Sequence, residues 1–310
     1  MKDILLTKPI PRAALWGIDA LKNEFGFKDF PLGIGQFWAF SCQEKEGCSN
    51  EILNSEYQGQ TLKDLFEKHP EIFQSKYNRF PFIIGFVGPQ DRLSVQVHPN
   101  NEVAKKHGYP SGKNEAWYFL KATVDADLIM GTKANNLKEL QALMAAGRWD
   151  DICVSRPIAA KDFVYIPAGM LHALQKDVIV YEVQQATDVT YRFYDYNRLD
   201  ASGKLRPLHL KEAMESIRFD FPDIQPKPLI QDLGGGTRTT FWSDSDFTIE
   251  SFQIDGTITL DLNRYLCMSV SSGSLNVNQT NVKKGDSFLV SPLLEKLEIT
   301  GKGEICCTSE

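Results

Sequence analysis

Runs in which apolar and polar residues alternate, separated by turn-forming residues, fill most of the chain and predict a mainly β protein with added helices. Four closely spaced strands are expected near the C-terminus, over residues 247–255, 257–262, 266–270 and 287–290. Apolar residues at helical spacing predict three helices, one that starts after Thr61, one over residues 137–146 and one over residues 210–218. Because each predicted helix has a single modest apolar stripe, we expect it to pack on a sheet.

An internal repeat indicates two similar β units. Residues 161–169 (KDFVYIPAG) resemble residues 285–293 (GDSFLVSPL), since both contain an acidic turn, an apolar strand and a proline turn. Only the first copy continues to a histidine, His172. We therefore expect two units of the jelly-roll kind, with the chemistry in the first.

The length of 310 residues also favours two domains, because a single hydrophobic core usually stops growing at roughly 250 residues. Residues 220–236 are rich in proline and glycine, which is typical of a connection between units. We expect one unit over residues 1–225, carrying the helical insertions, and a second over residues 226–310.

Composition and charge exclude several classes of protein. Hydrophobic residues make up 42% and charged residues 24%, as in an ordinary globular protein. A net charge of −6 leaves no basic surface for nucleic acid or an anionic membrane, so neither is an expected partner. The longest apolar run, residues 81–88, is far shorter than the roughly 20 residues that span a bilayer. With no secretory signal in residues 1–17 and six scattered cysteines, we expect a cytoplasmic protein with reduced thiols.

Three separate segments contain candidate metal ligands. In LSVQVH, strand alternation would place Ser94, Gln96 and His98 on one face. Glu115 lies in KNEAWYFL, a predicted buried strand, and a carboxylate buried there needs a partner. In IPAGMLH, a proline–glycine turn presents His172 at the start of a strand. Two imidazoles, a carboxylate and an amide oxygen suit a divalent ion such as zinc, iron or manganese.

Other interpretations of these residues stay open at this point. They can be separate, hydrogen-bonded polar residues, or the ferrous site of an oxygenase, which also uses two histidines and a carboxylate. The remaining histidines, His69, His107 and His209, lack a comparable context and are interpreted as structural.

Five motifs carry a family resemblance: LSVQVHP (93–99), GKNEAWY (112–118), IPAGMLHAL (166–174), EVQQATDVTYRFYDYNR (182–198) and LHLKEAM (208–214). In this order they closely resemble type I mannose-6-phosphate isomerases, particularly the short bacterial form. The resemblance implies a cupin-type β jelly-roll fold with a metal-free C-terminal unit and one zinc ion per chain. It also implies a small sugar phosphate as partner, through the interconversion of mannose 6-phosphate and fructose 6-phosphate.

The resemblance also implies roles for single residues. The family's metal ligands fall on His98, Glu115 and His172, and Gln96 matches a fourth ligand of longer members.

The expected reaction passes through an enediolate, whose negative oxygen needs a cation and whose proton needs a base. By the resemblance, the catalytic residues are Arg192, Lys113 and Glu182, and either Lys113 or Glu182 serves as the base. Arg192 would stabilise the enediolate or hold the phosphate; its structural alternative is an ion pair with Asp188 or Asp195. Ser94 and Asp188 are expected to contact the substrate.

The chain departs from the family pattern at two positions. Gly85 stands where members usually carry a lysine, and Gln36 replaces the glutamate of a GExW motif. These changes imply altered phosphate handling or a lower rate. The alternative function is therefore a sugar-phosphate-binding or regulatory homologue with reduced or lost catalysis.

Overall fold

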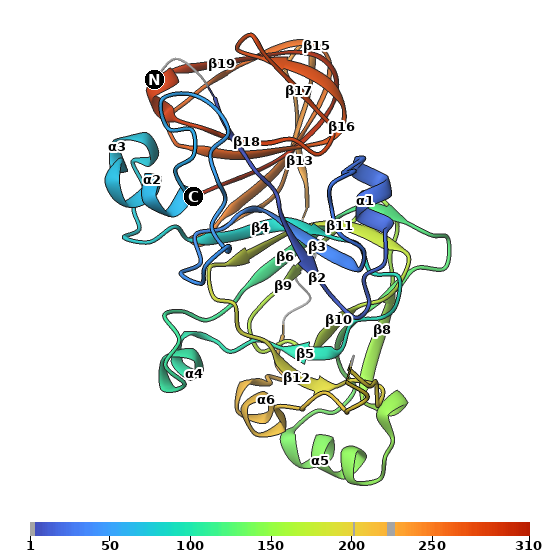
Figure 1. Cartoon of the computed structure of the whole chain (residues 1–310). Coiled ribbons are helices and arrows are strands. Elements are labelled where there is room, and N and C mark those ends of the chain that lie inside the picture. Colours follow the sequence, from blue (N-terminus) through green and yellow to red (C-terminus); the bar gives the residue numbers. More distant parts are fainter. Residues whose placement is uncertain (1–3, 201, 222–226) are drawn as a thin grey trace.

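The computed structural model describes residues 4–200, 202–221 and 227–310, and the strands within them form three antiparallel sheets (Figure 1). One sheet has six strands, in the order β2 (Ile10–Ala13), β3 (Ile34–Phe40), β4 (Phe82–Val87), β11 (Val178–Gln185), β6 (Glu115–Ala122) and β9 (Phe163–Ile166). A second has five, in the order β12 (Tyr191–Tyr194), β5 (Val95–Val97), β10 (His172–Leu174), β7 (Asp127–Thr132) and β8 (Cys153–Pro157).

The six-stranded and five-stranded sheets pack face to face as a sandwich. Their shared core joins Trp117 and Val180 of the first sheet to Leu128 and Leu174 of the second, all buried. The expected mainly β fold is confirmed, and the space between these two sheets is where inward side chains from both can meet.

The third sheet belongs mostly to the C-terminal part of the chain. Its strand order is β1 (Leu5–Thr7), β18 (Ser287–Val290), β16 (Leu266–Val277), β19 (Lys296–Ser309), β15 (Thr248–Asp261), β14 (Gly236–Ser243) and β13 (Leu229–Asp232), and β17 (Thr280–Lys283) pairs with β16. The strands predicted over 247–255 and 257–262 are in fact one, β15. The predicted break is wrong because Gly256 lies opposite Gly301 with both in left-handed backbone (φ 146° and 132°), which lets the ladder continue.

The outer face of the six-stranded sheet packs on the third sheet. Phe86 and Tyr181 share a buried cluster with Phe241 and Leu289, and the Tyr181 hydroxyl lies 2.9 Å from that of Thr308. The six-stranded sheet is therefore the middle layer between the other two (Figure 1).

The division of the chain between residues 225 and 226 remains a prediction, because it falls within residues 222–226, which lie outside the described residues. β1 pairs with β18, so the N-terminal strand lies in the sheet that the C-terminal part builds. Part of the expected connection, residues 229–232, forms the edge strand β13.

The described helices are α1 (Ala20–Phe25), α2 (Leu62–Lys68), α3 (Pro70–Phe73), α4 (Asn101–Lys106), α5 (Leu137–Ala145) and α6 (Leu210–Ser216), with 3-10 turns at Trp149–Asp151 and Pro292–Leu294. The three predicted helices are confirmed as α2, α5 and α6. Thr61 caps α2 by accepting a hydrogen bond from the Asp64 amide, and Asn136 caps α5 in the same way. No helix in the described ranges is long and apolar enough to cross a membrane. All six cysteines are free.

Candidate metal centre

Three buried side chains from the ends of three strands meet between the facing sheets. His98 directly follows β5, Glu115 begins β6 and His172 begins β10. Each side chain is only 1% exposed, and their potential ligand atoms all lie within 4.8 Å of one another. The fold thus brings together the candidate ligands that were 17 to 74 residues apart in the sequence.

The hydrogen bonds of the two imidazoles leave one ring nitrogen of each facing Glu115. His98 Nδ1 donates to the Val189 carbonyl and His172 Nδ1 donates to the Met170 carbonyl, each over 2.8 Å. Both Nε2 atoms then lie 3.1 Å from the Glu115 carboxylate. These Nε2 atoms and Glu115 Oε1 are buried without a hydrogen-bond partner among the described residues. Carbonyl-bound Nδ1 with a free Nε2 is the arrangement of metal-ligating histidines, so the residues fit a divalent metal ion.

The electrostatic surroundings favour the protonation states in which these side chains can bind a metal ion. Burial, and then the charge of Lys113, lower the pKa of His98 to about 3, which keeps its imidazole neutral. Burial alone would raise the pKa of Glu115, but its electrostatic interactions with His98, Lys113 and His172 outweigh burial and hold that pKa well below its ordinary value. A neutral imidazole and an ionised carboxylate are what a cation requires.

Strand register places Gln96 and Arg192 beside this cluster. Gln96 lies directly opposite His172 in the β5–β10 pair and opposite Arg192 in the β5–β12 pair. Residues directly opposite in an antiparallel pair share a face, so the three side chains form a row across the five-stranded sheet. Ser94 is buried just before β5, two residues from Gln96.

Arg192 makes no ion pair with a described carboxylate. Its Nη1 donates to the Pro207 carbonyl over 2.7 Å, and its Nε has no partner among the described residues. Asp195 instead pairs with Arg198 and Arg206. The alternative in which Arg192 is held by Asp195 or Asp188 is therefore not what the structure contains.

Glu182 and Lys113 lie on the wall of the same site. Lys113 Nζ is buried and 3.4 Å from Glu115 Oε2. The two oxygens of Glu182 each accept a hydrogen bond, from Trp117 Nε1 (3.0 Å) and from Gln184 Nε2 (2.9 Å). Burial, followed by the charge of Glu115, raises the pKa of Glu182 to about 7.

The donors Trp117 and Gln184 were not predicted as functional residues. Each lies two positions after a candidate site residue in the same strand, Glu115 and Glu182, so strand alternation already put them on the inward face. Their contact with Glu182 depends on the pairing of β6 with β11, where Trp117 is opposite Glu182.

Asp188 lies apart from the cluster. It is exposed, in the loop between β11 and β12, next to Val189, whose carbonyl accepts the His98 hydrogen bond. His69, His107 and His209 also lie outside the cluster, as predicted. His69 and His107 contact glutamates, and His209 Nδ1 accepts from the Arg192 amide.

Gly85 lies opposite Glu182 and Trp38 in neighbouring strands, on the inward face of the six-stranded sheet. A Cβ atom at this position would come within 2.2 Å of the Phe37 carbonyl oxygen. A side chain at residue 85 would therefore require the backbone of β3 or β4 to shift. Gln36 lies two pairs further along, opposite Val87.

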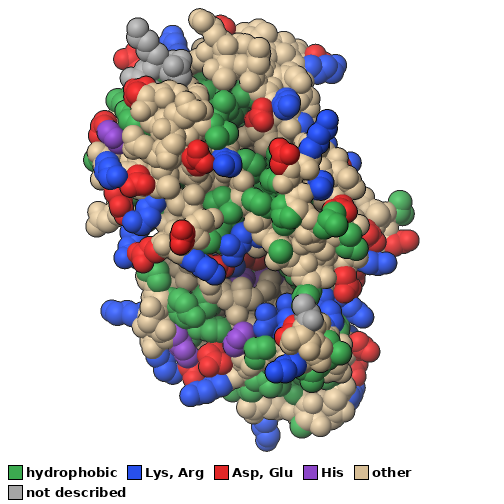
Figure 2. Space-filling view, viewed as in Figure 1, with side chains coloured by type: hydrophobic (Ala, Val, Ile, Leu, Met, Phe, Trp, Pro, Cys, Tyr) green, Lys and Arg blue, Asp and Glu red, His purple; other side chains and the backbone are tan. Residues whose placement is uncertain are grey.

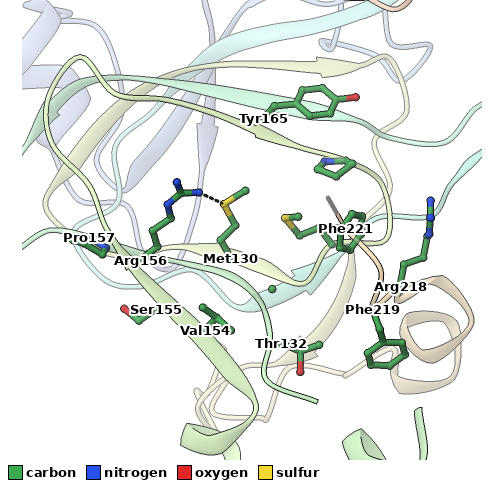
Figure 3. A pocket seen from close by; sticks show the side chains of 13 residues that line it. Met130, Thr132, Val154, Ser155, Arg156, Pro157, Tyr165, Arg218, Phe219 and Phe221 are labelled. Carbon is green, nitrogen blue, oxygen red and sulfur yellow. Dashed lines mark hydrogen bonds between the residues drawn. The ribbon is translucent and has the colours of Figure 1, made fainter. Parts of the chain in front are cut away.

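The surface is hollowed near the sandwich. Figure 2 shows a depression across the middle of one face, where basic, acidic and histidine side chains gather. A separate pocket of about 510 Å³ is lined by Met130, Arg156, Tyr165 and Met170 among others, and Arg156 Nη1 donates to the Met130 sulfur within it (Figure 3). His98, Glu115 and His172 do not line this pocket, so it is distinct from the cluster.

Two family descriptions match the sequence: "Phosphomannose isomerase type I, catalytic domain" over residues 12–125, and "Mannose-6-phosphate isomerase, cupin domain" over residues 237–309. The second match agrees with the expected cupin-like C-terminal unit.

Curated relatives match along nearly the whole chain. The mannose-6-phosphate isomerase of Streptococcus mutans is 34% identical, covering 94% of this chain and 93% of its own. The isomerase ManA of Bacillus subtilis is 33% identical, covering 97% of this chain and 96% of its own.

Solved structures agree. A crystal structure of the mannose 6-phosphate isomerase from Bacillus subtilis is 30% identical with a TM-score of 0.94, covering 98% of this chain and 99% of that one. A zinc-bound mannose 6-phosphate isomerase, 13% identical with a TM-score of 0.78 and 99% coverage of both chains, shares the fold. By sequence and by fold, this chain belongs to the type I mannose-6-phosphate isomerase family.

Proposed function

We propose that this chain is a zinc-dependent isomerase that interconverts D-mannose 6-phosphate and D-fructose 6-phosphate through an enediolate. The observation that carries the proposal is the buried cluster of His98, Glu115 and His172, with both Nε2 atoms turned toward one carboxylate. Relatives that cover nearly the whole chain are named for this activity, and a protein of the same fold is known in a zinc-bound form.

One zinc ion per chain would be held by His98, Glu115 and His172. Gln96 is the fourth ligand in this proposal, supported by its place opposite His172. When bound, zinc polarises the sugar carbonyl and its neighbouring hydroxyl and so favours the charge of the enediolate. The buried cluster keeps competing water away, which strengthens this electrostatic effect.

Glu182 is the group we assign to moving the proton between C2 and C1. Its two hydrogen bonds, from Trp117 and Gln184, fix the direction of the carboxylate. Its pKa of about 7 matches what a general base needs near neutral pH. Lys113, which lies against Glu115, supplies positive charge next to the developing oxyanion.

Arg192 is assigned to the anionic oxygens of the substrate. It has no carboxylate partner among the described residues, and it shares a row with Gln96 and His172 on the inward face. A planar guanidinium suits either the enediolate or the phosphate. Ser94, buried beside Gln96, and Asp188, exposed on the loop before β12, complete the proposed substrate contacts.

Turnover of mannose 6-phosphate by the zinc-loaded protein tests the proposal. We expect isomerisation to fructose 6-phosphate, its loss in His172→Ala, and its retention in His69→Ala, a histidine outside the cluster. Calorimetry with mannose 6-phosphate runs in parallel. Binding without turnover in the wild type would reject the isomerase and favour a sugar-phosphate-binding homologue, to which the glycine at residue 85 points.

A further inference from the structure

The C-terminal sheet supplies no residue of the metal cluster, yet one of its turns reaches the strand that carries Glu115. The turn joins β14 to β15 and includes Asp246. Asp246 Oδ2 accepts a hydrogen bond of 2.7 Å from Asn114 Nδ2, and Asn114 lies between Lys113 and Glu115 in the sequence. The turn therefore contacts the chain one residue away from a proposed ligand.

Asn114 makes hydrogen bonds through both its side chain and its backbone. Its Oδ1 accepts from the Ala168 amide over 2.8 Å, within the turn that leads to His172. Its backbone amide donates to Gln185 Oε1 over 2.8 Å, at the end of β11. The next amide, of Gly169, donates to the His98 carbonyl over 2.8 Å. The Asn114 side chain thus links the segments of Glu115 and His172, and the Gly169 amide connects the second of these to His98.

The turn that holds Asp246 is itself fixed. Asp244 Oδ1 accepts from the amides of Asp246 (2.8 Å) and Phe247 (3.0 Å), and Asp244 Oδ2 accepts from Trp242 Nε1 (2.8 Å). The Trp242 ring stacks on Tyr165 of β9, with centroids 4.1 Å apart and planes 14° apart. Tyr165 lies just before the turn to His172. The C-terminal sheet therefore contacts both segments that Asn114 links: the one before Glu115 through Asp246, and the one before His172 through Trp242.

We propose that Asn114 and Asp246 are positioning residues, through which the C-terminal sheet sets the separation of Glu115 from His172. Metal ligands must keep their distances within about 0.2 Å, so a link between the two ligand-bearing segments affects affinity without touching the ion. Loss of Asp246 would free the Asn114 amide to rotate, and loss of Asn114 would leave the Ala168 amide without its acceptor. This inference rests on the metal centre of the proposed function.

Zinc affinity, measured by competition with a chromophoric chelator, tests the link. Asp246→Ala is expected to weaken zinc binding about tenfold, the low end of effects from residues that support ligands. Asp246→Asn keeps an oxygen for Asn114 Nδ2 and should restore the affinity. Because Asp246 acts through Asn114, Asn114→Ala should cause a similar loss, and adding Asp246→Ala to it should cause no more.

Asp255→Ala is the matched control, since it removes an exposed acidic side chain of the same sheet whose ion pair among the described residues is with Lys302. The melting temperature of each zinc-free variant shows whether it is folded. Wild-type zinc affinity in a folded Asp246→Ala, or an equal loss in Asp255→Ala, would overturn the inference while leaving the proposed function intact. A wild type that binds no zinc would instead overturn the proposed function, and this inference with it.

Discussion

Removing the metal should destabilise the whole fold, because the cluster is poorly satisfied by protein groups alone. His98 Nε2, His172 Nε2 and Glu115 Oε1 are buried and have no hydrogen-bond partner among the described residues. Each such buried polar atom costs about 1–3 kcal/mol, so the three cost about 3–9 kcal/mol in the metal-free protein. An ion that takes all three as ligands removes this cost.

The coupling of metal binding to folding gives an independent value for this stabilisation. A ligand present at about 1,000 times its Kd stabilises the folded state by about 4 kcal/mol, within the range from the unsatisfied atoms. Large single-chain proteins gain about 2 °C in melting temperature for each kcal/mol. Zinc at that excess should therefore raise the melting temperature by about 8 °C.

Differential scanning calorimetry of chelator-treated and zinc-loaded protein measures this rise. In His172→Ala the rise should be nearly absent, whereas His69→Ala, which changes a histidine outside the cluster, should keep it. Equal melting temperatures with and without excess zinc in the wild type would refute the reasoning. An undiminished rise in His172→Ala would show that zinc binds elsewhere.

Three further outcomes are expected. Arg192→Ala should keep its zinc, measured by metal analysis, but lose about 100-fold in kcat/KM, and an unchanged kcat/KM would remove its assigned role. Burial raises the pKa of Glu182 from 4.5 to about 7. The free energy of unfolding of the metal-free protein, measured with urea, should therefore fall as the pH rises between these values. In Glu182→Gln this dependence on pH should be weaker. Gly85→Ala should cost about 1–3 kcal/mol in urea unfolding, since its Cβ would meet the Phe37 carbonyl, and an unchanged midpoint would contradict the packing described.

The close packing around Gly85 changes how the role of this residue can be tested. Because Gly85 stands where members of the family usually carry a lysine, Gly85→Lys would be the direct way to restore the missing cation. The 2.2 Å approach to Phe37 means that such a variant would perturb β3 and β4 before it could add charge. Close backbone packing of this kind depends on strand register, which the sequence does not display.

Local pattern was enough to find the candidate ligands. Alternation in LSVQVH put Gln96 and His98 on one face, and the apolar surroundings of Glu115 called for a partner, which the fold provides in two imidazoles. Helix caps were equally local, as at Thr61. The roles of Arg192 and Glu182 came from the family resemblance, and their assignment stays a prediction.

Contacts between residues far apart in the sequence could not be predicted from the sequence pattern. The donors to Glu182 include Trp117, 65 residues away, and the contact of Asn114 with Asp246 spans 132 residues. The continuity of β15 depends on a glycine in β19 that faces Gly256. In each case the decisive neighbour belongs to another strand, so single-strand periodicity carries no information about it.

The pairing of β1 with β18 has a consequence for how the protein is made. Leu6 and Thr7 also bond to residues 52–54, but Leu5 lies opposite Leu289, so this edge of the sheet forms only when segments 284 residues apart in the sequence meet. Until the two segments meet, the edge of β18 has no β1 to pair with, and closing so long a loop slows this step of folding. Nascent or truncated chains that lack either end should therefore depend on chaperones more than the finished protein does.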